Sequence, residues 1–511
     1  MSIKTKGYQI ILPEIKTAKS LQADVVVIGG GGAGIPAALT ALEEGAKSVI
    51  VLEKRFATGG DGLRCNHIFG VGSRLQKSVG STLSKDSFLE KNLASHHCDR
   101  VNPKIIRNFI YRSADTIDWL EKEGIVFKLL VSMSALNARG KRDPKMATTH
   151  VEKDMPEPDS LCSLGKMFRH LTQKAADDGV QFLVRTSAKK VIRGKDGKIT
   201  GVIAQTKNGQ QINIKTKSVI LCTGSFIGNK ELLKKYFPDR YIDDYASDAL
   251  RTNTGDGIPI AEDAGAAMEP YCTLLGHGGA APTVVNNQRT GVTSPITIRV
   301  NKEGKRFFAE NLTTALGSLQ LNQPGKMSYS LFDDKMLQSS MERTMPPQHP
   351  RIPTPPETWL DAKTYIQKYA RRGEWIKMAN TWDEIAKWMG CDPKVLKATI
   401  NEYNSFCDKG LDKAFGKEAK FLVPLRTPPF YANRSGVNMF ETMGPVRINE
   451  NMEIMDKDNK PIPGFYAAGV ITSGWVSCSY HVEGMAGTAL SYSMTSGRIA
   501  GENAAKYVQR K

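Results

Sequence analysis

A glycine-rich turn between a short apolar strand and a helix limits the possible folds of this chain more than any other feature. The run Val25-Val26-Val27-Ile28 has the β-branched composition of a strand that is buried on both faces. Gly29, Gly31 and Gly34 follow it with the spacing G-x-G-x-x-G, and residues 35–44 predict a helix. In such a unit the glycines allow a tight turn, a close approach of the backbone to a pyrophosphate, and close packing of the helix on the strand.

A second apolar strand completes the nucleotide-binding unit. Val49-Ile50-Val51-Leu52 ends at Glu53, about 20 residues after the last glycine, where an acid can bind the hydroxyl groups of a ribose. The start of the helix offers free N–H groups and the positive end of its dipole to phosphates. Residues 54–72 then form a stretch rich in small residues instead of another strand and helix, and no second G-x-G-x-x-G follows. We therefore expect one dinucleotide site, which holds FAD.

Further motifs lie in the middle and at the carboxyl end of the chain. They are Leu221-Cys222-Thr223-Gly224-Ser225-Phe226, Asn253-Thr254-Gly255-Asp256-Gly257, Pro461-Ile462-Pro463-Gly464-Phe465-Tyr466-Ala467-Ala468-Gly469, Gly487-Thr488-Ala489-Leu490 and Gly497-Arg498-Ile499-Ala500-Gly501. With these motifs the chain resembles the superfamily of fumarate reductase, succinate dehydrogenase and 3-ketosteroid dehydrogenase flavoproteins. The resemblance covers nearly the whole chain.

The resemblance implies an α/β fold with two parts. A discontinuous Rossmann-type FAD-binding domain would comprise residues 19–271 and 436–511, after an N-terminal extension over residues 1–18. An α+β capping domain would be inserted at residues 272–435, with the substrate held between cap and flavin. Within the first part, residues 179–217 predict a β-hairpin insertion with turns at Asp196-Gly197 and Asn208-Gly209.

The motifs and the resemblance together predict the residues that bind FAD. They are Gly29, Gly31, Gly32, Ala33, Gly34, Glu53, Lys54, Gly59, Gly60, Asp61, Gly62, Asn66, His67, Ala188, Thr223, Gly224, Asp256, Gly469, Ala489 and Leu490. The resemblance implies that the helix after Gly487 points its amino end at the flavin, where its dipole would stabilise the negative charge of the reduced ring. Covalently flavinylated members carry a histidine near the position of Gly60, so we expect non-covalent FAD.

Departures from the family concern the substrate. Lys305-Arg306-Phe307-Phe308-Ala309-Glu310 matches a family segment, but residues 311–316 lack the arginine that fumarate reductases use as proton donor. Residues 483–487 replace the arginine motif that binds a dicarboxylate, and Phe440-Glu441 replaces a pair of histidines. Substrate carboxylates would therefore lack partners, which is costly in a buried pocket, and Glu441 and Glu483 would repel them if they face the pocket. Fumarate is not the expected substrate.

Three residues are the candidates for moving a proton to or from the substrate: Tyr480, His481 and His277. The resemblance implies hydride transfer between flavin N5 and a carbonyl-activated C=C or CH–CH bond of a small molecule, as in an enone or enoate reductase or a ketosteroid dehydrogenase. One alternative is a flavoprotein electron-transfer subunit that works with an iron–sulfur partner. Another is a non-redox enzyme in which FAD is structural.

Composition limits the classes of binding partner and the cellular location that we expect for this protein. The net charge of +18 is spread along the chain, which favours a basic, solvated surface. The alternatives that would use this charge are an acidic protein that acts as external electron donor or acceptor, and an anionic substrate. No nucleic-acid module is present. The eight cysteines form no C-x-x-C pair, so we expect no metal site, and reduced thiols indicate a cytoplasmic protein. Residues 24–42 have the length of a membrane span, but their glycines favour a strand, a turn and a helix, so we expect no transmembrane segment.

Overall fold

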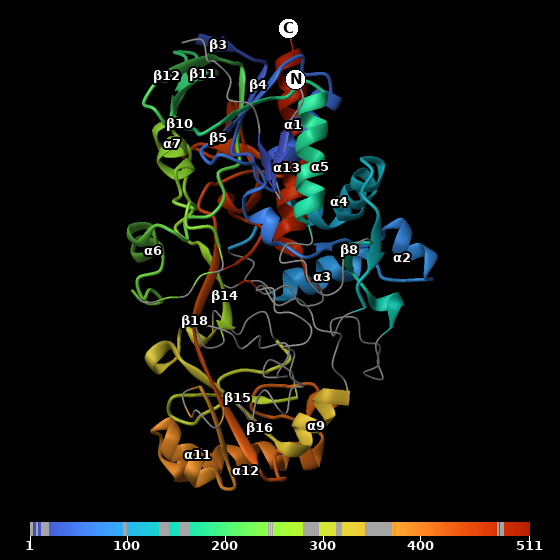
Figure 1. Ribbon diagram of the computed structural model, residues 1–511, viewed down its shortest axis with the longest axis vertical. Coiled ribbons are helices and arrows are strands. Elements are labelled where there is room, and N and C mark those ends of the chain that lie inside the picture. Colours follow the sequence, from blue (N-terminus) through green and yellow to red (C-terminus); the bar gives the residue numbers. More distant parts are fainter. Residues whose placement is uncertain are drawn as a thin grey trace.

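The computed structural model describes residues 4–6, 9–11, 20–95, 100–131, 143–153, 164–243, 245, 247, 249–279, 296–312, 319–342, 370, 373, 375–477, 480 and 485–510. Two main hydrophobic cores organise these residues. The larger core collects buried residues from both ends of the chain, and the second draws on residues 296–432. Figure 1 shows the larger unit at the top, the second at the bottom, and two long strands between them.

A six-stranded sheet forms the centre of the larger unit. Its strands, in spatial order, are β19 (Glu453–Met455), β20 (Pro461–Ala467), β13 (Ser218–Leu221), β4 (Val25–Ile28), β5 (Val49–Glu53) and β9 (Gln181–Val184). All neighbours are parallel except β19 and β20. Every residue of β4, β5 and β13 is buried, as the apolar runs of the sequence predict. The mixed α/β fold is thus confirmed, with the amino-terminal and carboxyl-terminal motifs in one sheet.

Two helices from opposite ends of the chain pack closely on this sheet. They are α1 (Gly34–Glu43) and α13 (Thr488–Gln509). A Cβ on Gly497 would lie 2.2 Å from the carbonyl oxygen of Ala33, and one on Gly501 would lie 2.5 Å from that of Ala37. The glycines of the terminal motif therefore allow the two helix backbones to touch. This contact joins the two sequence halves of the unit (Figure 1).

The predicted hairpin insertion is a three-stranded meander with a fourth strand at its edge. It consists of β10 (Thr186–Arg193), β11 (Ile199–Thr206) and β12 (Gln211–Lys215), and β3 (Ser20–Gln22) pairs with β12 in parallel. Its turns contain Gly197 and Gly209, whose φ angles are 81° and 84°, in agreement with the sequence. The predicted start at residue 179 is wrong, because residues 181–184 belong to the central sheet.

The second unit is built around another sheet. Its strands are β14 (Thr273–Gly279), β18 (Phe430–Met443), β16 (Ser328–Asp333) and β15 (Ile298–Asn301), with β17 (Ile376–Ala379) paired to β18. Helices α11 (Trp382–Met389) and α12 (Pro393–Lys409) cover it. The fourteen-residue strand β18 runs without a break across residues 435 and 436, from the second unit to the first (Figure 1). The division into two domains at this point stays a prediction.

The remaining elements surround the two units. They are β1 (Lys4–Lys6), β2 (Gln9–Ile11), β6 (Ile68–Phe69), α2 (Arg74–Ser78), α3 (Lys85–Ser95), α4 (Pro103–Lys122), β7 (Phe127–Leu129), β8 (Thr149–Glu152), α5 (Gly165–Asp177), α6 (Lys230–Tyr236), α7 (Gly257–Asp263) and α9 (Asp334–Glu342), with short 3₁₀ helices at Gly60–Arg64, Pro144–Met146, Pro324–Lys326, Ala419–Phe421 and Gly469–Ile471. Within the described ranges, no helix combines the length and apolar character needed to cross a lipid bilayer.

Candidate functional site

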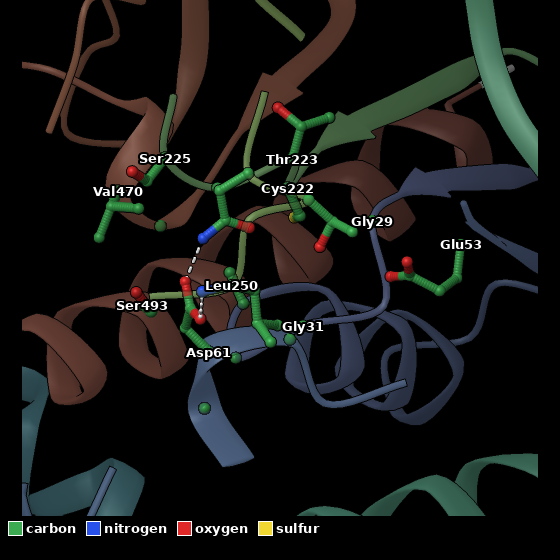
Figure 2. A pocket seen from close by; sticks show the side chains of 18 of the residues that line it. Gly29, Gly31, Glu53, Asp61, Cys222, Thr223, Ser225, Leu250, Val470 and Ser493 are labelled. Carbon is green, nitrogen blue, oxygen red and sulfur yellow. Dashed lines mark hydrogen bonds between the residues drawn. The ribbon is translucent and has the colours of Figure 1, made fainter. Parts of the chain in front are cut away.

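A cavity opens at the carboxyl ends of the parallel strands β4, β5, β13 and β20. This is the place where open α/β sheets bind their ligands. Most of the predicted FAD-binding residues line it: Gly29, Gly31, Gly32, Ala33, Glu53, Lys54, Gly60, Asp61, Gly62, Ala188, Thr223, Gly224, Asp256, Gly469, Ala489 and Leu490. Figure 2 shows Glu53 at one side of the cavity and Val470 and Ser493 at the opposite side, with Gly29, Gly31 and Asp61 between them.

Four predicted contacts lie outside the cavity wall: Gly34, Gly59, Asn66 and His67. A Cβ on Gly34 would lie 1.8 Å from the carbonyl oxygen of Gly29, so this glycine serves the packing of α1 against the turn. A Cβ on Gly487 would lie 2.8 Å from the carbonyl oxygen of His67. The backbone at His67 therefore packs on the turn that begins α13.

The glycine-rich turn leaves room for a ligand, as a pyrophosphate cradle requires. Gly29 has a φ of 107°, and a Cβ there would lie 2.3 Å from the carbonyl oxygen of Cys222. A Cβ on Gly31 would meet nothing closer than Gly60, at 3.7 Å, so Gly31 faces open space within the cavity. The sequence therefore needs glycine at Gly29 for the fold, and at Gly31 only for a bound group. This arrangement fits FAD.

Backbone groups hold the acid at the end of β5 in place. Glu53 is buried, and its carboxylate accepts hydrogen bonds from the N–H of Gly30 at 3.0 Å and from that of Arg55 at 2.8 Å. Each bond uses a different carboxylate oxygen, so the side chain has one orientation at the cavity wall. An acid fixed in this way is suited to accept further bonds from a ribose.

The surroundings of two other acids in the wall shift their pKa values in opposite directions. The Lys54 ammonium lies 2.8 Å from Asp256 and 2.8 Å from the Thr254 hydroxyl. Although burial opposes the effect, hydrogen bonds from Lys54 and Thr254 hold the pKa of Asp256 below its ordinary value. Burial raises the pKa of Asp61, even though its carboxylate accepts bonds from the Leu250 N–H, at 2.9 Å, and from the amide of Asn253 (Figure 2).

The structure gives Tyr480 a definite partner at the start of α13. Its buried hydroxyl accepts a hydrogen bond of 2.9 Å from the N–H of Ala489, in the first turn of α13. Burial raises the pKa of this hydroxyl well above its ordinary value, so it keeps its proton. His481 lies outside the described residues, and for His277 only the backbone is described, paired with Asn438 in β14 and β18. Roles of the two histidines stay predictions.

Replacing Tyr480 by phenylalanine is expected to destabilise the start of α13. The half-buried Ala489 N–H would lose its acceptor inside the protein, and the net loss of such a hydrogen bond costs about 1 kcal/mol. Thermal unfolding of the holoenzyme, monitored by circular dichroism, measures this loss. An unchanged unfolding temperature would show that the hydrogen bond makes no net contribution.

Sequence reasoning overlooked one group as a candidate for proton transfer. Glu441 lies in β18 and lines the cavity together with Phe440. Burial, with a further contribution from the charge of Asp61, raises the pKa of Glu441 to about 8. The unusual pair Phe440-Glu441 was visible in the sequence, but only as a replacement for histidines. In the described part of the chain, no group of three or more His, Cys, Asp or Glu side chains is arranged to hold a metal ion.

Comparisons with known proteins cover almost the whole chain. The FAD binding domain family matches residues 24–486. Vinyl phenol reductase of Lactiplantibacillus plantarum is 30% identical, and the match covers 97% of this chain and 98% of that protein. NADH:fumarate oxidoreductase of Klebsiella pneumoniae is 28% identical, and the match covers 94% of this chain and 48% of that protein. A crystal structure of 3-ketosteroid-delta4-(5alpha)-dehydrogenase from Rhodococcus jostii RHA1 has a TM-score of 0.76 at 24% identity and covers 95% of this chain and 97% of its own.

These matches agree with the cavity and with the motifs that line it. The family match spans both halves of the central sheet and the strands between the two units. The cofactor of the chain is therefore FAD. The chain belongs to the superfamily of FAD-dependent oxidoreductases, acting on CH–CH groups, that includes the fumarate reductases and the 3-ketosteroid dehydrogenases.

Proposed function

We propose that this enzyme reduces the conjugated C=C bond of a small molecule that lacks the two carboxylates of fumarate, using non-covalent FAD and electrons from an external donor. The larger unit would be the Rossmann-type FAD-binding domain, and the second unit the cap. The observation that carries the proposal is the carboxyl group of Glu441 in the cavity wall. A dicarboxylate would need cations there, because an unpaired buried carboxylate is costly.

The cations of the cavity wall lie at its other end. Among the described lining residues, Lys54 and Arg55 carry positive charge, and both directly follow Glu53 at the end of β5. Glu441 belongs to the opposite end, because its neighbour Thr442 shares a hydrogen bond of 3.0 Å with Ser225. Ser225 lies beside Val470 in Figure 2, across the cavity from Glu53. A substrate next to Glu441 would therefore find an acid and apolar side chains.

The chemistry divides between the cofactor and the protein. Once reduced by the external donor, bound FAD would supply the hydride. The chain would hold the dinucleotide at Gly31 and Glu53, and the first turn of α13, with Ala489 and Leu490 in the wall, would direct its positive dipole end toward the ring. Phe440 and Val470 would exclude water from the reacting carbon atoms. These are the roles that a C=C reductase requires.

The substrate class that we propose is a neutral or phenolic conjugated alkene. The support comes from the vinyl phenol reductase, which matches the chain from end to end at 30% identity and is named for a substrate without carboxylates. Such a molecule would avoid the repulsion that Glu441 offers to fumarate whenever that side chain is ionised. Enones of the kind named in the ketosteroid dehydrogenase structure form a second group to test.

The test is an anaerobic single turnover. The flavin is photoreduced, and fumarate, 4-vinylphenol and a 3-ketosteroid enone are added to separate samples while flavin reoxidation is followed by absorbance. We expect 4-vinylphenol or the enone to reoxidise the flavin at least about 100-fold faster than fumarate, equivalent to about 2.7 kcal/mol of transition-state discrimination. Fast reoxidation by fumarate would show that another cation completes a dicarboxylate clamp. If none of the three compounds reoxidises the flavin, the result would favour an electron-transfer subunit.

A further inference from the structure

Glu441 is a buried acid for which the described residues offer no hydrogen-bond or ion-pair partner. Only 9% of its surface is exposed. Among the residues that the structure describes, no group forms a hydrogen bond or an ion pair with its carboxyl. Buried carboxyl groups normally have such partners, because an unpaired one costs free energy. Buried acids with perturbed pKa values cluster at functional sites, so a carboxyl group of this kind in a ligand cavity is a candidate for catalysis.

A β-bulge directs this side chain into the cavity. In the pairing of β14 with β18, Leu275 faces Glu441 and Gly276 faces Met439, so the register shifts by one residue at Phe440. Successive residues of a regular strand point to opposite faces, but here both Phe440 and Glu441 line the cavity. Bulges re-aim side chains in this way, and they are over-represented next to active sites.

The next residue along β18 fixes the position of the bulge. The Thr442 hydroxyl shares a hydrogen bond of 3.0 Å with the Ser225 hydroxyl, and it accepts the N–H of Phe226 at 2.9 Å. The N–H of Thr442 in turn donates to the Ser225 hydroxyl at 3.1 Å. Ser225 belongs to the turn after β13, which carries Thr223 and Gly224 of the cavity wall. Glu441 is thus held rigidly against the residues proposed to bind FAD.

The groups around Glu441 favour its protonated form. Within the described part of the chain, the titratable groups that act on it or share its part of the wall are Asp61, Cys65 and Tyr480. Its partner on β14 is the apolar Leu275, and the first turn of α13 has no ionisable side chain. Burial and the charge of Asp61 raise the pKa of Glu441 to about 8, so it is a neutral acid with a proton to give at neutral pH.

We propose that Glu441 is the catalytic acid that protonates the substrate carbon during reduction of the C=C bond. The inference rests on the proposed function. One alkene carbon gains the hydride, which carries both electrons and leaves the cofactor oxidised, and the other carbon gains the proton of Glu441. The carboxylate that remains takes a proton from water before the next turnover. The external donor restores the reduced cofactor, so electrons and protons balance.

The proposal predicts a pH dependence with a definite sign. The group acts in its protonated form, so the rate constant of flavin reoxidation by 4-vinylphenol should be constant at lower pH and fall as pH rises through about 8. Glu441→Gln keeps the shape and the hydrogen-bonding ability of the side chain but has no acidic proton. It should slow this step about 100-fold or more and abolish the alkaline decline. Alkene binding to the oxidised enzyme, measured by difference absorbance, should change less than about threefold.

Two further variants separate chemistry from structure. Glu441→Asp should regain part of the rate together with an alkaline decline, because it restores an acidic proton. Tyr480→Phe should keep the alkaline decline, because Tyr480 does not supply the titrating proton. A Glu441→Gln enzyme with the wild-type rate constant and the wild-type pH profile would overturn the proposal, and so would loss of the decline in Tyr480→Phe with its retention in Glu441→Gln.

A measurement without substrate distinguishes failure of this inference from failure of the proposed function. The absorbance of the oxidised flavin in the holoenzyme is titrated with pH, because a new negative charge in the cavity alters the flavin spectrum. We expect a step near pH 8 in the wild type that is absent in Glu441→Gln. If no alkene reoxidises the enzyme but this step is present, the proposed function is wrong and Glu441 still titrates in the cofactor cavity. If alkenes react and the step is absent from the wild type, the assignment of Glu441 is wrong.

Discussion

Replacing Gly31 by alanine is expected to abolish FAD binding at ordinary concentrations while leaving the folded protein intact. The new methyl group would meet nothing of the protein closer than 3.7 Å, so the backbone accepts it without strain. It would occupy the space of the cavity where the cofactor pyrophosphate is expected to approach the turn. We expect the affinity for FAD to fall about 100-fold or more, equivalent to about 2.7 kcal/mol.

Gly34→Ala is the matched control, since it makes the same chemical change three residues away. Its methyl group would lie 1.8 Å from the carbonyl oxygen of Gly29, which cannot move without distorting the turn. This variant should lose about 3 kcal/mol or more of unfolding free energy even without cofactor. Flavin fluorescence titration of the apoprotein and thermal unfolding measure the two effects separately. Normal FAD affinity in Gly31→Ala would show that the pyrophosphate does not approach this turn.

Replacing Arg306 by methionine is expected to destabilise the second unit strongly. The guanidinium of Arg306 bonds both oxygens of Glu310, at 2.9 Å and 2.8 Å, and Asp412 at 2.9 Å, and all three side chains are almost completely buried. Lys417 lies 3.3 Å from Glu310, but it does not replace the bonds to Asp412. Removing one member of a buried ion network leaves charges uncompensated and costs about 3–5 kcal/mol.

The loss of stability caused by Arg306→Met should be confined to the second unit. Trp382 and Trp388 belong to the second core or pack against it, whereas Trp119 and Trp475 belong to the larger core. Only part of the change in tryptophan fluorescence during urea unfolding should therefore shift to lower denaturant. Release of flavin should shift less, because the cofactor cavity belongs to the larger unit. Arg426→Met is the matched control, since Arg426 forms a pair with Asp408 at 2.7 Å on the exposed surface of the same unit. It should change the midpoint only slightly. Equal shifts of the urea midpoint in Arg306→Met and Arg426→Met would show that the buried ion network does not stabilise the second unit more than an exposed ion pair does.

Arg306 also shows how a correct motif leads to an incomplete interpretation. Residues 305–310 match a family segment, and from the sequence this match was used only to locate the arginine that is missing after it. The structure shows that Arg306 and Glu310 themselves form the buried centre of the second unit. Their partner Asp412 follows them by more than a hundred residues, so no local pattern could reveal the network.

The sequence by itself determined the nucleotide-binding half of the site. The strand at residues 25–28, the turn at Gly29 and the helix after it depend on short-range chemistry: β-branched side chains, a positive φ and helix periodicity. The motifs at residues 461–469 and 497–501 likewise predicted their place beside that unit, and β20 and α13 occupy it. Such elements can be predicted because their signals lie in residues that are close together in the sequence.

Only the tertiary structure decided what faces the reacting end of the cavity. Glu441 is an acid in a strand whose side-chain direction depends on its register with β14, and the bulge at Phe440 reverses the alternation that the sequence alone would predict. Its raised pKa depends on burial under several elements and on Asp61, some 380 residues earlier in the chain. Strand register, burial and charge are long-range quantities. From the sequence, Glu441 only replaces a histidine of the family; its position in the cavity wall is what supports the proposal that it donates a proton.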